Sequence, residues 1–199
     1  MNGQEFTDAL RDAHETPLSR LGSSKWVYAL TDGEMDGDSV KIAWTTEASA
    51  AHETFAAWAD DADGDAADVF GDAAETLAND GSGDAGTTPP TYETLADLGG
   101  TTERAGGLLA WTLVTEKTLA QMVGFFVGDA DPATANTFRG YRSDVEELRA
   151  AAVDLLDAVC DDDADWDAAR AAADRVIEAA YDDYVETLES MGIKPKNVC

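Results

Sequence analysis

Histidine and cysteine are scarce in this chain, and their scarcity excludes several kinds of metal and catalytic site. The sequence contains two histidines, His14 and His52, and two cysteines, Cys160 and Cys199. The cysteines form no CxxC pair and no zinc-ligand spacing, and the chain has no Ser-His-Asp order, P-loop or GxGxxG motif. We therefore expect no zinc domain and no disulfide framework, with both thiols reduced in a cytoplasmic protein.

Positive charge is also scarce. The chain has 13 basic against 41 acidic residues, which gives a formal net charge of -28. Binding to nucleic acid needs clustered Lys and Arg to displace counterions, and here the basic residues are scattered. We therefore expect no nucleic-acid partner. The Asp-rich, Lys-poor composition resembles that of cytosolic proteins from salt-loving archaea, in which the charge keeps the protein dissolved at molar salt.

Long uncharged apolar runs are absent. The most apolar window, residues 108–127, is interrupted by Glu116, Lys117 and Gln121, whereas a membrane span needs roughly 18 uncharged residues or more. The first ten residues are polar and acidic, without the basic and apolar regions of a signal peptide. We therefore expect a cytoplasmic protein with no membrane partner.

What the chain does contain is apolar residues at helical spacing. They make up 44% of the residues and show no strand pattern, which predicts a single all-α domain over residues 1–199. The window at 108–127 is apolar on so much of its circumference that it belongs inside a bundle. Whether a helix over 102–127 is continuous or broken near Thr115 stays open. The predicted parts are an N-terminal helical segment at 2–30, a bundle core at 39–160 with helices at 39–61, 65–79, 92–98, 102–127 and 132–160, and a C-terminal helix at 166–191.

Helix ends carry their own signals. Asn2 and Glu5 have the spacing of a capping box. After the central helix, Gly128 is suited to a left-handed terminal position, Asp131 to a cap, and Pro132 to the first turn of the next helix. These signals predict a tight turn between two antiparallel helices.

Two segments carry a family resemblance. TTEASAAHETFAAWA at 45–59 resembles the first metal-bearing helix of rubrerythrin-like, ferritin-like proteins, in which one inward Glu is followed by small residues and an aromatic band. AHETFAAWA and GFFVGDADP resemble segments of a haloarchaeal group of rubrerythrin-like proteins. The resemblance covers roughly two thirds of the chain. It implies a ferritin-like up-down helical bundle, here with additional N- and C-terminal helices.

The same resemblance implies a two-iron carboxylate centre with peroxidase or oxidase activity. Such a centre takes a Glu from each of two helices and a Glu-x-x-His from each of two others. This chain has no Glu-x-x-His, and Glu75 on the second helix is followed by Ala78. Only Glu47 is carried over as a candidate metal ligand, and Trp44 and Trp58 are placed to shield it and raise its pKa.

His52 is a weaker metal candidate, on the flank of its helix with Asp60 and Asp61 two turns further on. His14 falls in an apolar stripe, which is typical of a hydrogen-bonded core or interface histidine. We expect no catalytic residue and no bound cofactor; iron or another divalent metal stays an alternative.

The leading functional hypothesis is a non-catalytic, rubrerythrin-related bundle that acts through protein interaction or self-association. The first alternative is a metal-dependent oxidoreductase of the two-iron type. The second is a carrier of an apolar ligand, held in a pocket lined by Trp44, Phe55, Trp58, Trp111 and Phe126.

The charge predicts that folding requires salt. Repulsion among -28 net charges acts over ~10 Å at 0.1 M salt but over only ~3 Å at molar salt. We expect circular dichroism across a KCl titration to show loss of helix as salt is removed. Full and stable helicity at about 50 mM salt would contradict this prediction.

Overall fold

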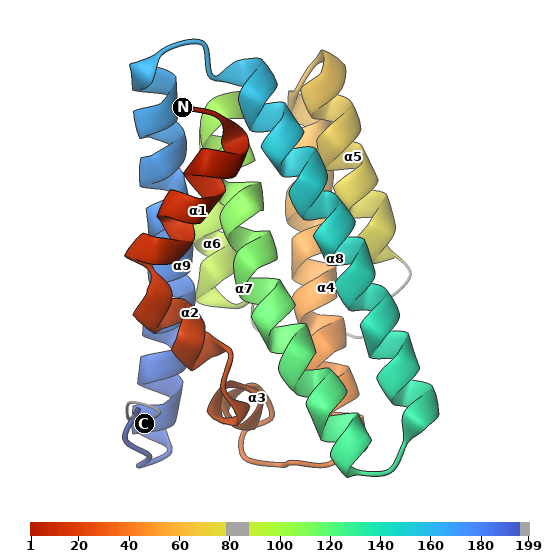
Figure 1. Cartoon of the computed structure of the whole chain (residues 1–199). Coiled ribbons are helices and arrows are strands. Elements are labelled where there is room, and N and C mark those ends of the chain that lie inside the picture. The colour runs from red at the N-terminus through yellow and green to blue at the C-terminus, as the bar shows by residue number, and fades with distance from the viewer. Residues whose placement is uncertain (79–87, 196–199) are drawn as a thin grey trace.

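The computed structural model describes residues 1–78 and 88–195, and all regular secondary structure within them is helical (Figure 1). The helices are α1 (Gly3–Ala13), α2 (Glu15–Leu21), α3 (Ser24–Leu30), α4 (Gly37–Asp61), α5 (Gly64–Ala78), α6 (Pro90–Ala96), α7 (Thr101–Gly128), α8 (Pro132–Val159) and α9 (Asp163–Ser190). The prediction of an all-α bundle is confirmed. No helix in these residues is long and apolar enough to cross a membrane.

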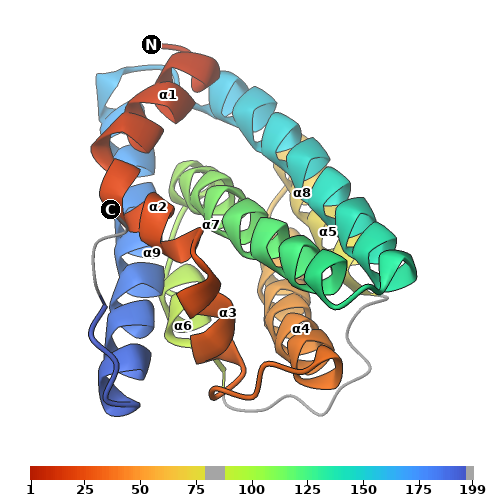
Figure 2. The ribbon, with the colours of Figure 1, turned by 60° about the horizontal axis from the view of Figure 1, so that its bottom comes forward.

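Helix α7 lies inside the bundle, as its sequence predicts. Figure 2 shows it surrounded by α8, α9, α4 and the three N-terminal helices, and its most extensive contacts are with α8 and α9. Helices α4 and α5 form one antiparallel pair, and α7 and α8 form another (Figure 1). The short helix α6 packs on α9 and α4, which places it beside the candidate site.

Helix α7 is continuous, so the alternative of a break near Thr115 is wrong. Thr115 lies in the middle of the helix and is buried. The hydroxyls of Thr112 and Thr118 bond the carbonyls of Leu109 and Val114, at 2.7 and 3.3 Å. A threonine whose hydroxyl bonds the preceding turn can be buried in a helix without leaving a polar group unsatisfied.

Caps explain where the helices begin. Asn2 and Glu5 form the predicted capping box. Helix α4 starts two residues earlier than expected, because the side chain of Asp36 accepts hydrogen bonds from the backbone of Asp38 and Ser39. Helix α9 begins before Trp166, because Asp162 forms a capping box of its own. Acidic residues therefore start both helices, where their negative charge suits the helix N-terminus.

The turn between α7 and α8 differs from expectation in one position. Asp131 caps α8 through the backbone N–H of Thr134, with Pro132 in the first turn, as predicted. Gly128, however, is the last residue of α7, and Ala130 takes the left-handed conformation with φ 57°. The backbone N–H of Asp131 bonds the carbonyl of Phe126 at 2.9 Å, which sets the reversal two residues later than the glycine.

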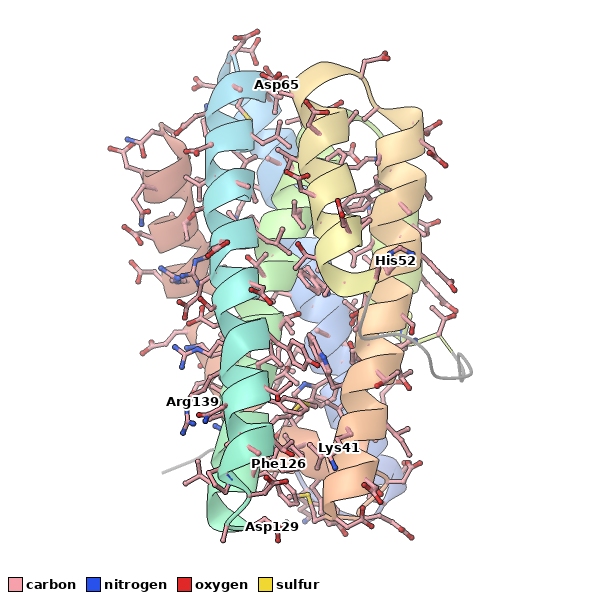
Figure 3. All side chains as sticks on the ribbon, turned by 90° about the vertical axis from the view of Figure 1, so that its right-hand side faces the viewer. Lys41, His52, Asp65, Phe126, Asp129 and Arg139 are labelled. Atoms are coloured by element: carbon pink, nitrogen blue, oxygen red, sulfur yellow. The ribbon has the colours of Figure 1, made fainter. Side chains whose placement is uncertain are left out.

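The large aromatic side chains fill the core. Trp44, Phe55, Trp58, Trp111 and Phe126 are at most 3% exposed. Phe55 and Trp111 meet edge to face with ring centroids 5.1 Å apart, a favourable aromatic geometry. At the lower end of the bundle, Phe126 lies beside the first turns of α4, and Lys41 Nζ is 5.9 Å from the centre of its ring (Figure 3).

Cys160 ends α8 as a buried free thiol. Burial raises its pKa to about 11, and three neighbouring aspartates add to the effect. Cys199 lies outside the described residues.

A close backbone approach fixes the crossing of α7 and α9. A Cβ added at Gly106 would lie 2.3 Å from the carbonyl oxygen of Ala169. Gly106 therefore allows the two helices to approach closely, and any side chain there would push them apart.

Gly106→Ala is expected to lower the free energy of unfolding by about 1–3 kcal/mol, because the added methyl overlaps the backbone of α9. Gly124→Ala is the matched control in the same helix, since nothing lies within 4 Å of its added Cβ. The free energy of unfolding of that variant should be unchanged or higher by up to about 1 kcal/mol. Chemical denaturation of both variants checks the prediction; equal stabilities would contradict it.

Candidate functional site

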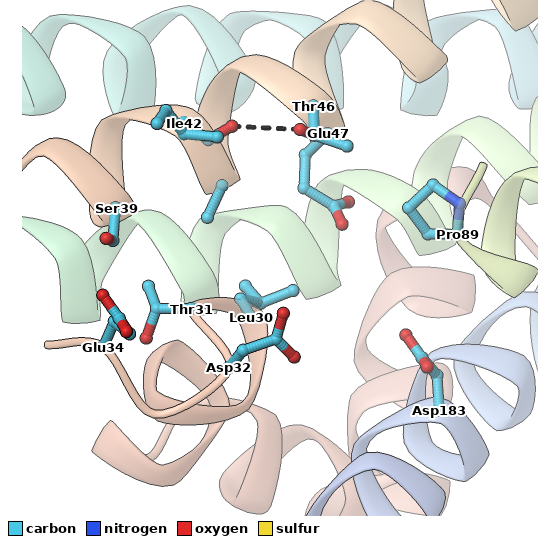
Figure 4. Close-up of a pocket in the computed structure, with 11 residues that line it drawn as sticks. Leu30, Thr31, Asp32, Glu34, Ser39, Ile42, Thr46, Glu47, Pro89 and Asp183 are labelled. Atoms are coloured by element: carbon cyan, nitrogen blue, oxygen red, sulfur yellow. Dashed lines mark hydrogen bonds between the residues drawn. The ribbon is translucent and has the colours of Figure 1, made fainter. Parts of the chain in front are cut away.

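Glu47 lies on α4 in the wall of a cleft of about 530 Å³. The cleft lies between α4, the α3–α4 connection, Pro89 and α9 (Figure 4). Its lining includes three further carboxylates, those of Asp32, Glu34 and Asp183, and no basic residue among those the structure describes. The side chains of Glu47, Asp32 and Asp183 point toward the same space (Figure 4). The volume lies in the range of small-molecule sites.

A buried chain of hydrogen bonds anchors Glu47 on its core side. The indole Nε1–H of Trp111 donates to the Tyr92 hydroxyl at 3.1 Å, and that hydroxyl donates to Glu47 Oε2 at 2.8 Å. Tyr92 and Trp111 are each 2% exposed. Because an indole can only donate, the Tyr92 oxygen accepts from it and directs its single proton to Glu47. The chain thus joins α7, α6 and α4 and has a fixed direction.

Burial dominates the electrostatics of this site. It raises the pKa of Glu47 to about 7; the hydrogen bond from Tyr92 opposes the increase, and the negative charge of Asp183 adds to it. Burial also raises the pKa of Asp183, although the Thr187 hydroxyl bonds that carboxylate. The pKa of Tyr92 is raised well above its ordinary value by burial and by the charge of Glu47. Near neutral pH, Glu47 is therefore poised between its two protonation states.

A second, much smaller space lies on the core side of Glu47. Its volume is about 20 Å³, and Trp26, Trp44 and Trp111 help to line it. It is too small for an organic ligand, so the tryptophans give no support to the apolar-carrier hypothesis. Trp44 lines this small cavity together with Glu47, whereas Trp58 lines neither space and packs on Phe55 and Phe70.

The structure does not bring His52 to Glu47. His52 Nδ1 lies 2.9 Å from the carbonyl oxygen of Ala74 on α5 (Figure 3). Since a carbonyl only accepts, Nδ1 carries the hydrogen, and His52 ties α4 to α5. The expected neighbour Asp61 pairs instead with Arg104 at 3.1 Å.

His14 has the structural environment expected of a core or interface histidine. It is 9% exposed, and its Nε2 lies 2.7 Å from Asp174 Oδ1. The same oxygen accepts from Arg170 Nε at 2.7 Å. This contact joins the α1–α2 junction to α9.

The donor set around Glu47 does not fit a two-iron centre. Within the described residues, no three His, Cys, Asp or Glu side chains are placed to hold one metal ion. The groups that share the cleft and the small cavity with Glu47 supply carboxylate and hydroxyl oxygens, and neither histidine lines them. The two-iron centre takes a histidine from each of two Glu-x-x-His turns.

Sequence reasoning found Glu47 but missed its partners. Tyr92 was assigned only to the start of a short helix, and Asp32, Glu34 and Asp183 were not singled out. One signal existed for Tyr92, because a tyrosine on the apolar face of a helix usually needs a partner for its hydroxyl. No local pattern points to Asp183, which lies on the other side of the cleft.

Comparisons with protein-family models, with curated proteins and with solved structures found no match to this chain. The resemblance to rubrerythrin-like proteins therefore rests on its two sequence segments.

The raised pKa of Glu47 predicts how stability depends on pH. Folded Glu47 binds its proton more tightly than unfolded Glu47, so the free energy of unfolding should fall as pH rises from about 4.5 to about 7. Glu47→Gln removes this contribution and keeps an acceptor for Tyr92. Between about pH 5 and about pH 8, the free energy of unfolding should fall less in the variant than in the parent. The difference between the two falls should be at most about 3 kcal/mol.

The matched control is Glu53→Gln, at an exposed position of the same helix, which should keep the parent's pH dependence. Urea denaturation in molar KCl at the two pH values measures the difference. Identical pH dependence in Glu47→Gln and the parent would contradict a raised pKa.

Proposed function

We propose that this chain is a non-catalytic helical bundle that works by binding, and that the cleft over Glu47 receives an alkylammonium group. The proposal includes a finer fold assignment, a ferritin-like bundle of rubrerythrin-related descent. The two resembling segments and the two antiparallel helix pairs support that assignment.

One observation carries the functional proposal. Glu47 Oε2 is bonded by Tyr92, whereas no hydrogen bond to the other carboxylate oxygen is found among the described residues. The carboxylate faces the cleft, near a second carboxylate whose pKa is also raised. A positively charged donor at this point would satisfy the free oxygen and relieve the repulsion between Glu47 and Asp183.

The walls of the cleft favour an ammonium group on an aliphatic stem over a bare ion. Leu30, Ile42 and Pro89 contribute apolar surface beside the carboxylates. Methylene groups bury themselves along such surface while the charged head meets a carboxylate. The same chemistry is offered by a free amine and by the lysine side chain of a protein partner or a second copy of this chain. A lysine source would make the bundle a protein-interaction or self-association module.

The metal-dependent oxidoreductase is the alternative of a different class. Metal analysis of protein expressed with added iron separates the two. Iron near two per chain, with a visible spectrum that bleaches on reduction, would contradict a non-catalytic bundle.

Calorimetric titration of butylammonium and of Nα-acetyl-lysine methylamide in molar KCl tests the binding proposal. High salt screens the general attraction of an acidic surface, so saturable binding reports a specific site. Glu47→Gln and Asp183→Asn are each expected to weaken binding at least fivefold. Sedimentation of the same variants tests whether the lysine comes from a second copy of this chain. In that case dimer formation would depend on Glu47.

A matched control comes from another acidic groove, of about 520 Å³ between α5 and α8, which Asp72, Glu75, Asp144 and Glu147 help to line. Glu75→Gln removes one charge there and should leave binding unchanged. Absence of binding by both probes with no dimer, or equal losses in Glu47→Gln and Glu75→Gln, would contradict the proposal.

A further inference from the structure

We propose that the ligand of the cleft is a linear aliphatic polyamine, with one ammonium group at Glu47 and Asp183 and another at Glu34. This inference rests on the proposed function, because it names the molecule that brings the ammonium group. It adds a second contact point at the far end of the cleft.

The cleft is long in one direction. Ser39 and Glu47 both line it, and their separation of eight positions in the sequence corresponds to roughly 12 Å along α4. Glu34 lies beside Ser39 at one end, whereas Glu47 lies with Asp183 and Pro89 toward the other (Figure 4). The negative charges are therefore distributed along the cleft, with Asp32 between the two ends.

This distribution distinguishes an extended cation from a compact one. No three carboxylates of the cleft come close enough together to hold a single metal ion. An ammonium group needs up to three acceptors around it. The end of the cleft near Pro89 offers the carboxylates of Glu47 and Asp183. The opposite end offers the carboxylate of Glu34 and the hydroxyl of Ser39. Two separated ammonium groups match these two sets.

Apolar surface also lines the cleft between its two ends, and part of it is exposed. Ile42 lines the cleft and is 65% exposed. Leu30 and Pro89 extend this apolar wall. A chain of methylene groups between two ammonium groups would cover Ile42, and each buried methylene favours binding.

Charge balance also supports several positive charges. Within residues 1–78 and 88–195, four carboxylates and no basic side chain line the cleft. A monoamine would offset one of these charges, whereas a triamine would offset most of them. The groove between α5 and α8 is equally acidic, but its four carboxylates are exposed, whereas Glu47 and Asp183 are half-buried, and none of the residues that line it is an exposed large apolar one. It therefore offers charge without the other features of the cleft.

A chain-length series tests the inference. Butylammonium, 1,4-diaminobutane and the triamine spermidine are titrated into the full chain in molar KCl by calorimetry. Affinity is expected to rise along the series, by at least tenfold from the monoamine to spermidine. Glu34→Gln should remove most of that gain and leave butylammonium binding unchanged, whereas Glu47→Gln should weaken all three amines. Both positions tolerate the change, because Glu34 is exposed in a loop and glutamine keeps an acceptor for Tyr92.

The outcomes distinguish failure of the polyamine inference from failure of the proposed ammonium site. Equal affinities for butylammonium and spermidine would overturn the polyamine inference and leave the ammonium site standing. Binding of none of the three amines would overturn the polyamine inference, and the proposed function would then be decided by Nα-acetyl-lysine methylamide and by sedimentation. Glu147→Gln, in the groove between α5 and α8, should have no effect. A loss of spermidine affinity there equal to that in Glu34→Gln would show general attraction to an acidic surface and overturn the inference.

Discussion

The hydrogen-bond chain from Trp111 through Tyr92 to Glu47 is the constraint on which the site depends. A carboxylate at the edge of an apolar core is costly unless a donor satisfies it. Here the donor is a tyrosine that is itself held by an indole, so three helices must be in place before the carboxylate is stabilised. The same hydrogen bonds hold the short helix α6 in place, because its buried tyrosine donates to Glu47 on α4 and accepts from Trp111 on α7.

The rest of the molecule separates charge from core. Carboxylates start the helices, as Asp36 and Asp162 do. A few pair with arginine, as Glu116 does with Arg142 and Arg149. Such exposed or half-exposed pairs contribute little to stability, so burial of apolar and aromatic side chains around α7 has to supply most of it. Glu47 is different because it borders both the small cavity in the core and the open cleft.

The sequence predicted those parts of the fold that depend on local patterns of residues. Apolar stripes marked the helices, and the capping box at Asn2 and the Asp131-Pro132 pair marked two of their starts. Thr115 was ambiguous, because the same residue can cap a helix or lie buried within one. Gly128 misled because the following residues, not the glycine, complete the turn through the bond from Asp131 to Phe126.

The site could be predicted only in part, for a different reason. Glu47 was identifiable from its own helix, since small and aromatic residues surround it in the sequence. Asp183 and Tyr92 reach it from α9 and α6, and which residues of two distant helices face a third depends on their packing. The sequence also offered a histidine, His52, on the same helix, but its ring turns to α5 and bonds the carbonyl of Ala74.

The central claim is that Glu47 is a partly buried carboxylate held by Tyr92 and open to the cleft. The most direct measurement is a pH titration of the Glu47 side-chain carboxyl by carbon-13 NMR, assigned with Glu47→Gln, in molar KCl. The account predicts a midpoint of about 7, well above the ordinary glutamate value, and a shift of this midpoint in Tyr92→Phe toward a still higher pH because the Tyr92 hydrogen bond is lost. A midpoint near the ordinary glutamate value of about 4.3 that is insensitive to Tyr92→Phe would contradict it.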